Sequence, residues 1–210
     1  MRTTLILTIF SLMLFSCNRK PAPATQEGEA AAMGDKAAVT GKYELKSAIV
    51  EYKSDMMGFE ASQILYFDDH GQKEATETSM EIMGNKTRNV SVTVDGQTVN
   101  FDPENKTGFK APAMQGSGQL NFRQLTDEIT RQWNLKEKGT ETFLGKECTR
   151  YSVDNKEYNM KGEYWVWKGI PLKMELEMAT SRMVMEAVSV TENADIPADR
   201  FEIPGDIVFN

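Results

Sequence analysis

The sequence predicts a mainly antiparallel β domain with one main helix, and three observations support this. Apolar and polar residues alternate with a period of two over most of the chain after residue 41, as in strands that bury one face. Turn sequences such as Asp95-Gly96 and Lys168-Gly169 separate these runs, which is the pattern of hairpins. One segment, residues 122–133, has the three- and four-residue apolar spacing of a helix.

Residues 1–16 have the features of a lipoprotein signal peptide. Arg2 supplies a short positive region, and the apolar run from Leu5 to Phe15 is shorter than the ~20 residues of a membrane span. The run ends in Leu14-Phe15-Ser16-Cys17, which is similar to the lipobox of bacterial lipoproteins. We therefore expect lipidation of Cys17 and anchoring to the membrane through its acyl chains. The alternative is a simple secretory signal with an incidental cysteine.

Residues 17–41 are predicted to be the lipidated cysteine and a disordered tether, because the segment is rich in Ala, Pro, Gly, Glu and Lys without an apolar period. Asn18, Arg19 and Lys20 follow the cysteine without an acidic run. By resemblance to known sorting signals, this favours the periplasmic face of the outer membrane within the cell envelope. Residues 42–210 are long enough for one domain.

Composition and motifs argue against several functions. The formal net charge is −7 at pH 7, so the chain lacks the basic face that nucleic acid requires. The sequence has no nucleophile elbow, HExxH motif or phosphate-binding glycine loop, and His70 would have to carry any acid–base chemistry alone. We predict no enzyme, no catalytic residues, no cofactor and no nucleic-acid partner.

Two patterns could suggest a metal site, and we predict a structural role for both. Asp68-Asp69-His70-Gly71 lacks the spacing of a closed coordination sphere, so we expect a polar hairpin turn. Methionine thioethers can hold Cu(I), but the methionines beyond the tether lie at apolar strand positions without a His or Cys cluster. Cys148 lies in an alternating strand and is predicted to be a small buried residue.

From residue 42 the chain is predicted to form consecutive antiparallel strands. The first group covers residues 43–55, 59–68, 73–83, 87–94 and 97–102. The Asp95-Gly96 turn sets Val92 against Val99 and Val90 against Phe101, which gives this hairpin one apolar face.

The register around Gly84-Asn85 stays open. A two-residue loop pairs Glu81 with Arg88. A three-residue loop pairs Met80 with Val90.

The middle of the chain carries a connection and the helix. Residues 103–118 are turn-rich but include apolar side chains such as Phe109 and Met114, so they could form a mobile flap. Asn121 is a plausible N-cap for the helix over residues 122–133. Its apolar stripe consists of Phe122, Leu125, Ile129 and Trp133. Further strands are expected at 141–144, 147–153 and 157–161, and an irregular closing segment at 196–209.

The stretch 163–190 is predicted to be the centre of the domain. A period of two puts these side chains on one face: Ile170, Leu172, Met174, Leu176 and Met178. A two-residue turn at Lys168-Gly169 would place Trp167 opposite Ile170. It would also place Trp165 opposite Leu172.

A second reversal, about Thr180-Ser181, would pair Met178 with Met183 and Leu176 with Met185. Three strands would then share one aromatic and methionine-rich surface. That surface is either an ordinary filled core or the wall of a cavity.

Several segments together resemble the half-open β-barrel proteins of the LolA, LolB and LppX type, and related uncharacterised lipoproteins of Bacteroidota. They are the hairpin with Phe101-Asp102-Pro103, GKECTRYSV at 145–153, WVWKGIPLKME at 165–175 and PADRFEIP at 197–204. The resemblance implies a curled half-open barrel of roughly ten strands with one main helix over its concave face. Its hollow would receive acyl chains. The chain departs from LolA because it is expected to be anchored and lacks the long N-terminal helix, so a fixed binder is favoured over a shuttle.

We accordingly predict that the membrane-anchored protein binds acyl chains or another lipophilic ligand. The hydrophobic lining would comprise Trp165, Trp167, Leu172, Met174, Leu176, Met178, Met183 and Met185, and the lid Phe109, Met114, Phe122, Leu125, Ile129 and Trp133. Methionine suits such a wall because its flexible side chain adapts to irregular ligands. The alternative is a structural or adaptor envelope lipoprotein with a filled core, a protein partner and no ligand.

Overall fold

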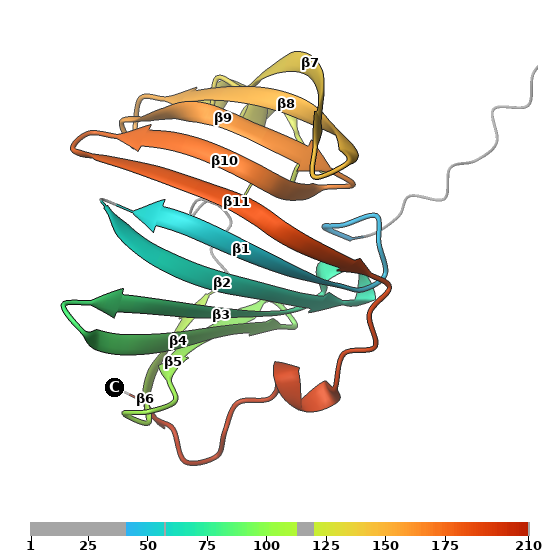
Figure 1. The fold of residues 1–210 in the computed structure, drawn as a ribbon. Coiled ribbons are helices and arrows are strands. Elements are labelled where there is room, and N and C mark those ends of the chain that lie inside the picture. The colour runs from blue at the N-terminus through green and yellow to red at the C-terminus, as the bar shows by residue number, and fades with distance from the viewer. Residues whose placement is uncertain (1–40, 57, 113–119, 210) are drawn as a thin grey trace, which may run out of the picture. The chain divides into compact units, whose positions relative to one another are not determined.

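One continuous sheet dominates the computed structural model, which describes residues 41–56, 58–112 and 120–209 (Figure 1). Its strands are β1 (Ala48–Met56), β2 (Phe59–Asp68), β3 (Lys73–Ile82), β4 (Asn85–Val94), β5 (Gln97–Asp102), β6 (Thr107–Pro112), β7 (Lys136–Phe143), β8 (Lys146–Asn155), β9 (Met160–Trp167), β10 (Ile170–Met178), β11 (Ser181–Glu192) and β12 (Val208–Phe209). The helices are short: α1 (Asp127–Gln132) and the 3-10 turns η1 (Asp69–Gly71) and η2 (Ala198–Phe201).

The sheet is open and curled, as the sequence predicted, with 12 strands in the order β12-β6-β5-β4-β3-β2-β1-β11-β10-β9-β8-β7. Every neighbouring pair is antiparallel except the short parallel pair β12 and β6. In the described part of the chain, no pairing joins the β7 edge to the β12 edge. The pairing of β1 with β11 brings the first described strand to the centre of the sheet.

The two faces of the sheet are named by what packs on them. The inner face carries α1 and its flanking residues 120–135, and the outer face is opposite. On the inner face, Leu65 of β2 lies beside Thr76 of β3 and then Ser91 of β4. On the outer face, Ala75 lies beside Val92, whose row the closing segment covers with Ile207 and Phe201. The apolar side of the sheet therefore changes between β2 and β3.

The hairpin predictions hold where the turn residues are unambiguous. Asp95 and Gly96 both have positive φ, and Val92 pairs with Val99 as expected. The neighbouring turn is formed by Met83 and Gly84, with Ile82 opposite Asn85, so neither register considered for it is correct.

The centre of the sheet departs from the predicted register at one point. The Lys168-Gly169 turn and the pairing of Trp167 with Ile170 are confirmed. A bulge between Pro171 and Lys173 places Trp165 opposite Lys173, so its predicted pairing with Leu172 is wrong. Proline lacks an N–H and is found in central strands mainly at bulges, which makes Pro171 the local cause.

The reversal between β10 and β11 lies one residue earlier than predicted, at Ala179-Thr180. Leu176 pairs with Met183, and Met174 with Met185. A change of register by two residues leaves all of these side chains on the same face.

The helix begins later than predicted. Thr126, not Asn121, is its N-cap, and the Thr126 hydroxyl accepts a hydrogen bond from Ile129 N at 3.2 Å. Asp127 and Glu128 complete a favourable acidic first turn. Phe122 therefore lies in an irregular segment ahead of α1.

The segment predicted to be a flap contains strand β6, and Met114 lies outside the described residues. The closing segment contains η2 and β12 between irregular stretches. The polar turn predicted around His70 is confirmed as η1.

Candidate functional site

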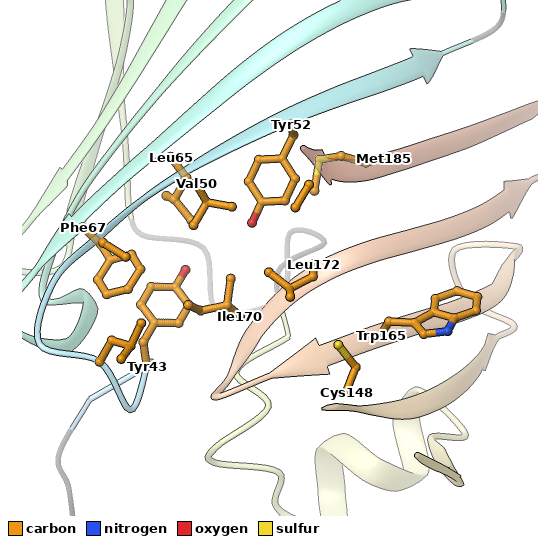
Figure 2. Close-up of a cluster of buried hydrophobic side chains, with 13 residues drawn as sticks. Tyr43, Val50, Tyr52, Leu65, Phe67, Cys148, Trp165, Ile170, Leu172 and Met185 are labelled. Carbon is orange, nitrogen blue, oxygen red and sulfur yellow. The ribbon is translucent and has the colours of Figure 1, made fainter. Parts of the chain in front are cut away.

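The first apolar cluster is formed mainly by β1, β2, β10 and β11, with Trp165 from β9 and Cys148 from β8 (Figure 2). Among its most deeply buried members are Val50, Phe67, Ile170 and Leu172, each 0% exposed. Cys148 is buried in the same cluster, as predicted, and burial raises the pKa of its thiol. Every second residue of a strand faces the same side of the sheet, so neighbouring strands bring these side chains together.

A second apolar cluster lies on the inner face of β8, β9 and β10. Residues of the sheet contribute Val153, Met160, Tyr164, Val166 and Leu176, and the covering residues are Leu120, Phe122, Trp133 and Leu135. Met174 packs against both clusters. The inner face is therefore apolar without interruption from β2 across β1, β11, β10 and β9 to β8.

Residues 120–135, which we call the cover, are attached to the sheet mainly through side chains. The ring of Phe122 lies 5.2 Å from the rings of both Tyr151 and Tyr164. Among the described residues, the first main-chain hydrogen bond from the cover to a strand runs from Asp154 N to Trp133 O, at 3.0 Å. The cover ahead of Trp133 can thus separate from the sheet without breaking a main-chain ladder.

Residues 41–47 pack against the first cluster through Tyr43 and Leu45. Main-chain bonds tie Lys42 to His70 and Glu44 to Lys168. The Lys42 ammonium donates to both carboxylate oxygens of Glu74 at 2.9 Å. Burial, and then the Glu74 charge, raises the pKa of Tyr43 well above its ordinary value, so this tyrosine stays neutral.

One side chain of the cover is bonded to residues 41–47. Arg123 Nη1 donates to Tyr43 O at 2.9 Å. Arg123 Nη1 also donates to Gly41 O at 3.4 Å, and because both bonds come from one part-buried side chain, they restrain the cover without fixing its path.

The predicted lining residues are divided between the two apolar clusters. Five methionine and leucine side chains share the inner face: Met174, Leu176, Met178, Met183 and Met185. Leu172 is buried in the first cluster. Trp165 is 7% exposed and is a buried member of the first cluster, with its ring centre 5.1 Å from Arg150 Cζ and 4.9 Å from Lys173 Nζ. Trp167 lies 4.0 Å from Lys146 Nζ.

The predicted lid residues are likewise only partly brought together. Phe122 and Trp133 are buried in the second cluster, and Leu125 and Ile129 pack against it. Phe109 is 55% exposed on β6. It belongs neither to the two inner clusters nor to the outer cluster around Val92 and Ile207.

Sequence reasoning missed the contribution of β1, β2 and β9 to the inner face. The first cluster includes four side chains of β1 and β2: Val50, Tyr52, Leu65 and Phe67. The second cluster includes Tyr164 of β9. The signal was partial, since residues 48–50 and 64–67 are continuous apolar runs, which indicate strands without showing which side chains face inward. What could not be seen was that β1 pairs with β11.

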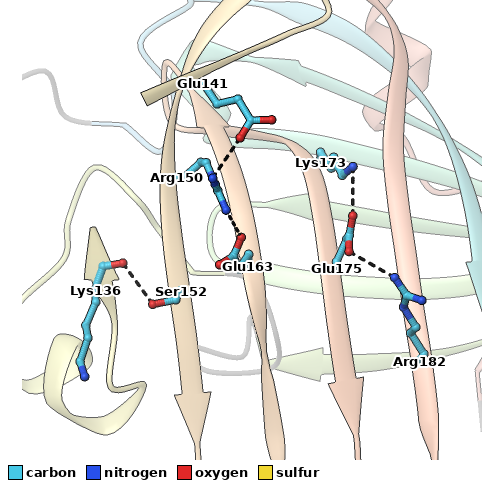
Figure 3. Close-up of polar contacts among 8 residues, drawn as sticks. All are labelled: Lys136, Glu141, Arg150, Ser152, Glu163, Lys173, Glu175 and Arg182. Carbon is cyan, nitrogen blue, oxygen red and sulfur yellow. Dashed lines mark hydrogen bonds and ion pairs between the residues drawn. The ribbon is translucent and has the colours of Figure 1, made fainter. Parts of the chain in front are cut away.

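The outer face of β8–β11 carries a network of ion pairs (Figure 3). Arg150 bridges Glu141 and Glu163, and Glu175 bridges Lys173 and Arg182. Hydrogen bonding from Lys173 is the main reason that the pKa of Glu175 is lowered.

Two open hollows lie on the outer face, and both are lined mainly by polar and charged side chains. One, of about 750 Å³, includes the row Glu186, Lys53, Ser62, Ser79 and Arg88 across five strands. The other, of about 310 Å³, is lined by Lys161, Gly162, Glu163, Glu175, Glu177 and Arg182. Neither contains a residue of the apolar clusters.

Within the described ranges, no group of three or more His, Cys, Asp and Glu side chains is placed to hold a metal ion. No helix in that part of the chain is long and apolar enough to cross a membrane.

No family model and no curated protein matches the chain. Solved structures do. An uncharacterized conserved protein from Thermus thermophilus is similar over 80% of this chain and 91% of its own, with 10% identity and a TM-score of 0.54. MucB is similar over 80% of this chain and 61% of its own, with 12% identity and a TM-score of 0.53. The chain therefore spans less than two thirds of the length of MucB. The lipoprotein LppX from Mycobacterium tuberculosis matches over 74% and 91%, with 12% identity and a TM-score of 0.39.

At these identities the likeness shows the fold alone. The chain has the half-open barrel fold of the LolA, LolB and LppX type, as the motifs in its sequence implied. The Bacteroidota part of that resemblance has no support from the similar structures.

Proposed function

We propose that this protein is a membrane-anchored envelope lipoprotein that binds acyl chains, or another lipophilic ligand, on the inner face of its half-barrel. The observation that carries the proposal is the uninterrupted apolar inner face beneath a cover that has no main-chain bond to the sheet before Trp133 in the described residues. The half-open barrel fold supports it. Binding would involve burial without chemistry.

The bound ligand would displace the cover from the inner face. Its apolar side chains, Phe122 above all, occupy the surface that a ligand chain would take. Each CH₂ group of a ligand that moves from water to this surface contributes about 0.8 kcal/mol, so a long acyl chain can offset the exposure of Phe122 and Leu120. Met174, Met178 and Met183 are only partly buried and can adapt to the chain.

The N-terminal region would place the domain at the membrane. We propose that residues 1–16 are a signal peptide, that Cys17 is lipidated, and that residues 17–41 tether the domain 42–210 to the periplasmic face of the outer membrane. In the native cell, Cys17→Ser should release the protein from the membrane fraction. Retention of this variant in the membrane fraction would contradict the anchor.

Ligand binding is tested with the purified domain. Native mass spectrometry after gentle purification should show a bound lipid, and the domain should bind pyrenedecanoic acid methyl ester, detected by fluorescence. Met174→Glu puts a charge between the two apolar clusters and should weaken binding at least about tenfold.

Val184→Glu is the matched control, since Val184 pairs with Glu175 on the outer face and its replacement should leave the affinity unchanged. Circular dichroism checks that both variants fold. If the wild-type domain carries no lipid and binds no probe, the proposed ligand function fails.

The structure also favours a second candidate, an adaptor with a filled core. Ile170 and Leu172 are fully buried, and the larger open hollow lies on the outer face among charged side chains. A protein partner would meet that face. In this case Val184→Glu, which alters the outer hollow, should impair function in the cell, whereas conservative changes of Met174 should not.

A further inference from the structure

Tyr164 lies at the centre of the inner face, on β9, directly opposite Met174 on one side and Tyr151 on the other. Its side chain is 1% exposed, beneath the ring of Phe122. Met174 joins the two apolar clusters, so Tyr164 lies beside their junction.

The hydroxyl group of Tyr164 has no hydrogen-bond partner among the described residues. Buried polar side-chain atoms in proteins almost always have one, so the exception calls for an explanation. Tyr52, in the first cluster, shows the ordinary arrangement, because its hydroxyl donates to Pro171 O at 3.1 Å. Burial raises the pKa of Tyr164 to about 12, so its hydroxyl is neutral and remains a donor at physiological pH.

The other buried polar atoms without a partner have local explanations. Asn155 uses its side-chain oxygen to accept from Tyr158 N at 3.1 Å, which shapes the turn after β8. Arg150 pairs through its Nη atoms with Glu141 and Glu163, and Trp165, beside Arg150, belongs to the first cluster and lies away from the cover. Tyr164 supplies the hydroxyl group among these atoms, and it lies in the second cluster, which the cover packs on.

We infer that Tyr164 is the polar anchor of the acyl site, and that its hydroxyl donates a hydrogen bond to the carbonyl oxygen of an acyl ester. This inference rests on the proposed function and specifies its ligand class. The surrounding cluster consists of uncharged side chains, including Phe122, Val166 and Leu176. A free carboxylate would lie there without a cation, whereas an ester carbonyl accepts one hydrogen bond and brings no charge. The carbonyl would meet the hydroxyl when the cover lifts.

The test compares two probes that differ in the carbonyl. Pyrenedecanoic acid methyl ester carries it, and dodecylpyrene has a plain alkyl chain on the same ring. In the Tyr164→Phe domain, the affinity for the ester should fall about tenfold, and the affinity for dodecylpyrene should stay within about twofold of wild type. Tyr151→Phe removes a hydroxyl from the neighbouring position on the same face and should change neither affinity.

Folding of Tyr164→Phe is checked by thermal unfolding, and its midpoint should equal or exceed that of wild type, since an unpartnered polar group is removed. Equal losses for both probes, or no loss for either, would overturn the inference while leaving the acyl-binding function standing. If the wild type binds neither probe, both fail.

Ester carbonyls occur both in phospholipids and in the acylated N-termini of lipoproteins. A short-chain phosphatidylcholine and a diacylated lipopeptide therefore serve as competitors for the ester probe. Displacement by one of them identifies the source, and displacement by both shows that the site recognises the ester itself. If neither displaces the probe, the inference is wrong.

Discussion

The two halves of this sheet use opposite faces as their apolar side. In β1, β2 and β8–β11 the apolar residues face inward and the cover and residues 41–47 pack on them. In β3–β6 the apolar residues face outward, and the closing segment packs on them through Phe201 and Ile207. The inner face of β3–β6 instead carries hydroxyl and amide groups, such as those of Thr76, Ser91 and Asn100.

This difference limits where an acyl chain can bind. A half-barrel with a uniformly apolar hollow could take a ligand anywhere along its inner face. Here a chain can be buried only against the half that runs from β2 to β8, because hydroxyl groups such as the Thr93–Thr98 pair, 2.8 Å apart, already satisfy one another on the other half. The polar half would better suit the hydrated end of an amphiphile.

The largest expected effect comes from the boundary between the halves. Leu65→Asp buries an unpaired charge at a position 7% exposed and should lower the free energy of unfolding by at least about 4 kcal/mol. Thr76→Asp, directly opposite on the same face, should lower it by about 1 kcal/mol or less. Urea unfolding measures both. Similar losses at the two positions would show that the inner face does not change character here.

The outer apolar cluster gives the next largest effect. Ile207 of the closing segment is 8% exposed and packs against the outer face of the sheet, so Ile207→Ala should lower the free energy of unfolding by about 2 kcal/mol or more. Ile203→Ala, at a position 40% exposed in the same segment, is the control and should change it by less than about 0.5 kcal/mol. Neither change should alter the affinity for the acyl ester probe, and a loss of affinity would place the ligand on the wrong face.

Local patterns explain what the sequence predicted well. Alternation and turn residues act over a few positions, so the β class, the Asp95-Gly96 hairpin and the Lys168-Gly169 turn could be predicted before any contact was known. The apolar row of Val92 and Val99 was also predicted, but the face on which it lies was not. That face depends on how β3 pairs with β2, and on the closing segment more than a hundred residues later in the chain.

The missed features of the site have the same origin. One bulge beside Pro171 puts Trp165 opposite Lys173, although strict alternation paired it with Leu172. A threonine followed by two acidic residues begins the helix at Thr126, so Phe122 covers the sheet from an irregular segment. Pro171 and Thr126 are signals that could have been weighed, whereas the central position of Tyr164 requires the pairing of β9 with both neighbours.

The free energy of unfolding at alkaline pH should depend on the Tyr164 hydroxyl and not on the threonine hydroxyls of the polar half. Burial raises the pKa of Tyr164 from 10.0 to about 12. Because the folded state has the higher pKa, ionisation of Tyr164 leaves the stability unchanged below pH 10 and lowers it as the pH rises from 10 towards about 12, where the unfolded chain ionises and the buried hydroxyl does not.

Between these pH values, wild type should therefore lose about 2 kcal/mol more stability than Tyr164→Phe in urea unfolding. Tyr43 and Tyr52 are present in both proteins and cancel in this comparison. Thr93→Val, in the polar half, should follow wild type. Parallel pH profiles for wild type and Tyr164→Phe would mean that water reaches the Tyr164 hydroxyl.

The smallest effect is expected on the outer face of the half that is proposed to bind the ligand. Arg182 pairs with Glu175 at 3.2 Å, but its side chain is 65% exposed, so Arg182→Ala should lower the free energy of unfolding by about 0.5 kcal/mol or less. High salt should remove most of that difference, because exposed charges are screened. Lys173 is 21% exposed and contacts Glu175, Glu186 and Trp165, so Lys173→Ala should have the larger effect of the two. If Arg182→Ala instead reduced acyl binding, the outer network would have to control the inner face through β10, and the two faces of this half could no longer be treated as independent.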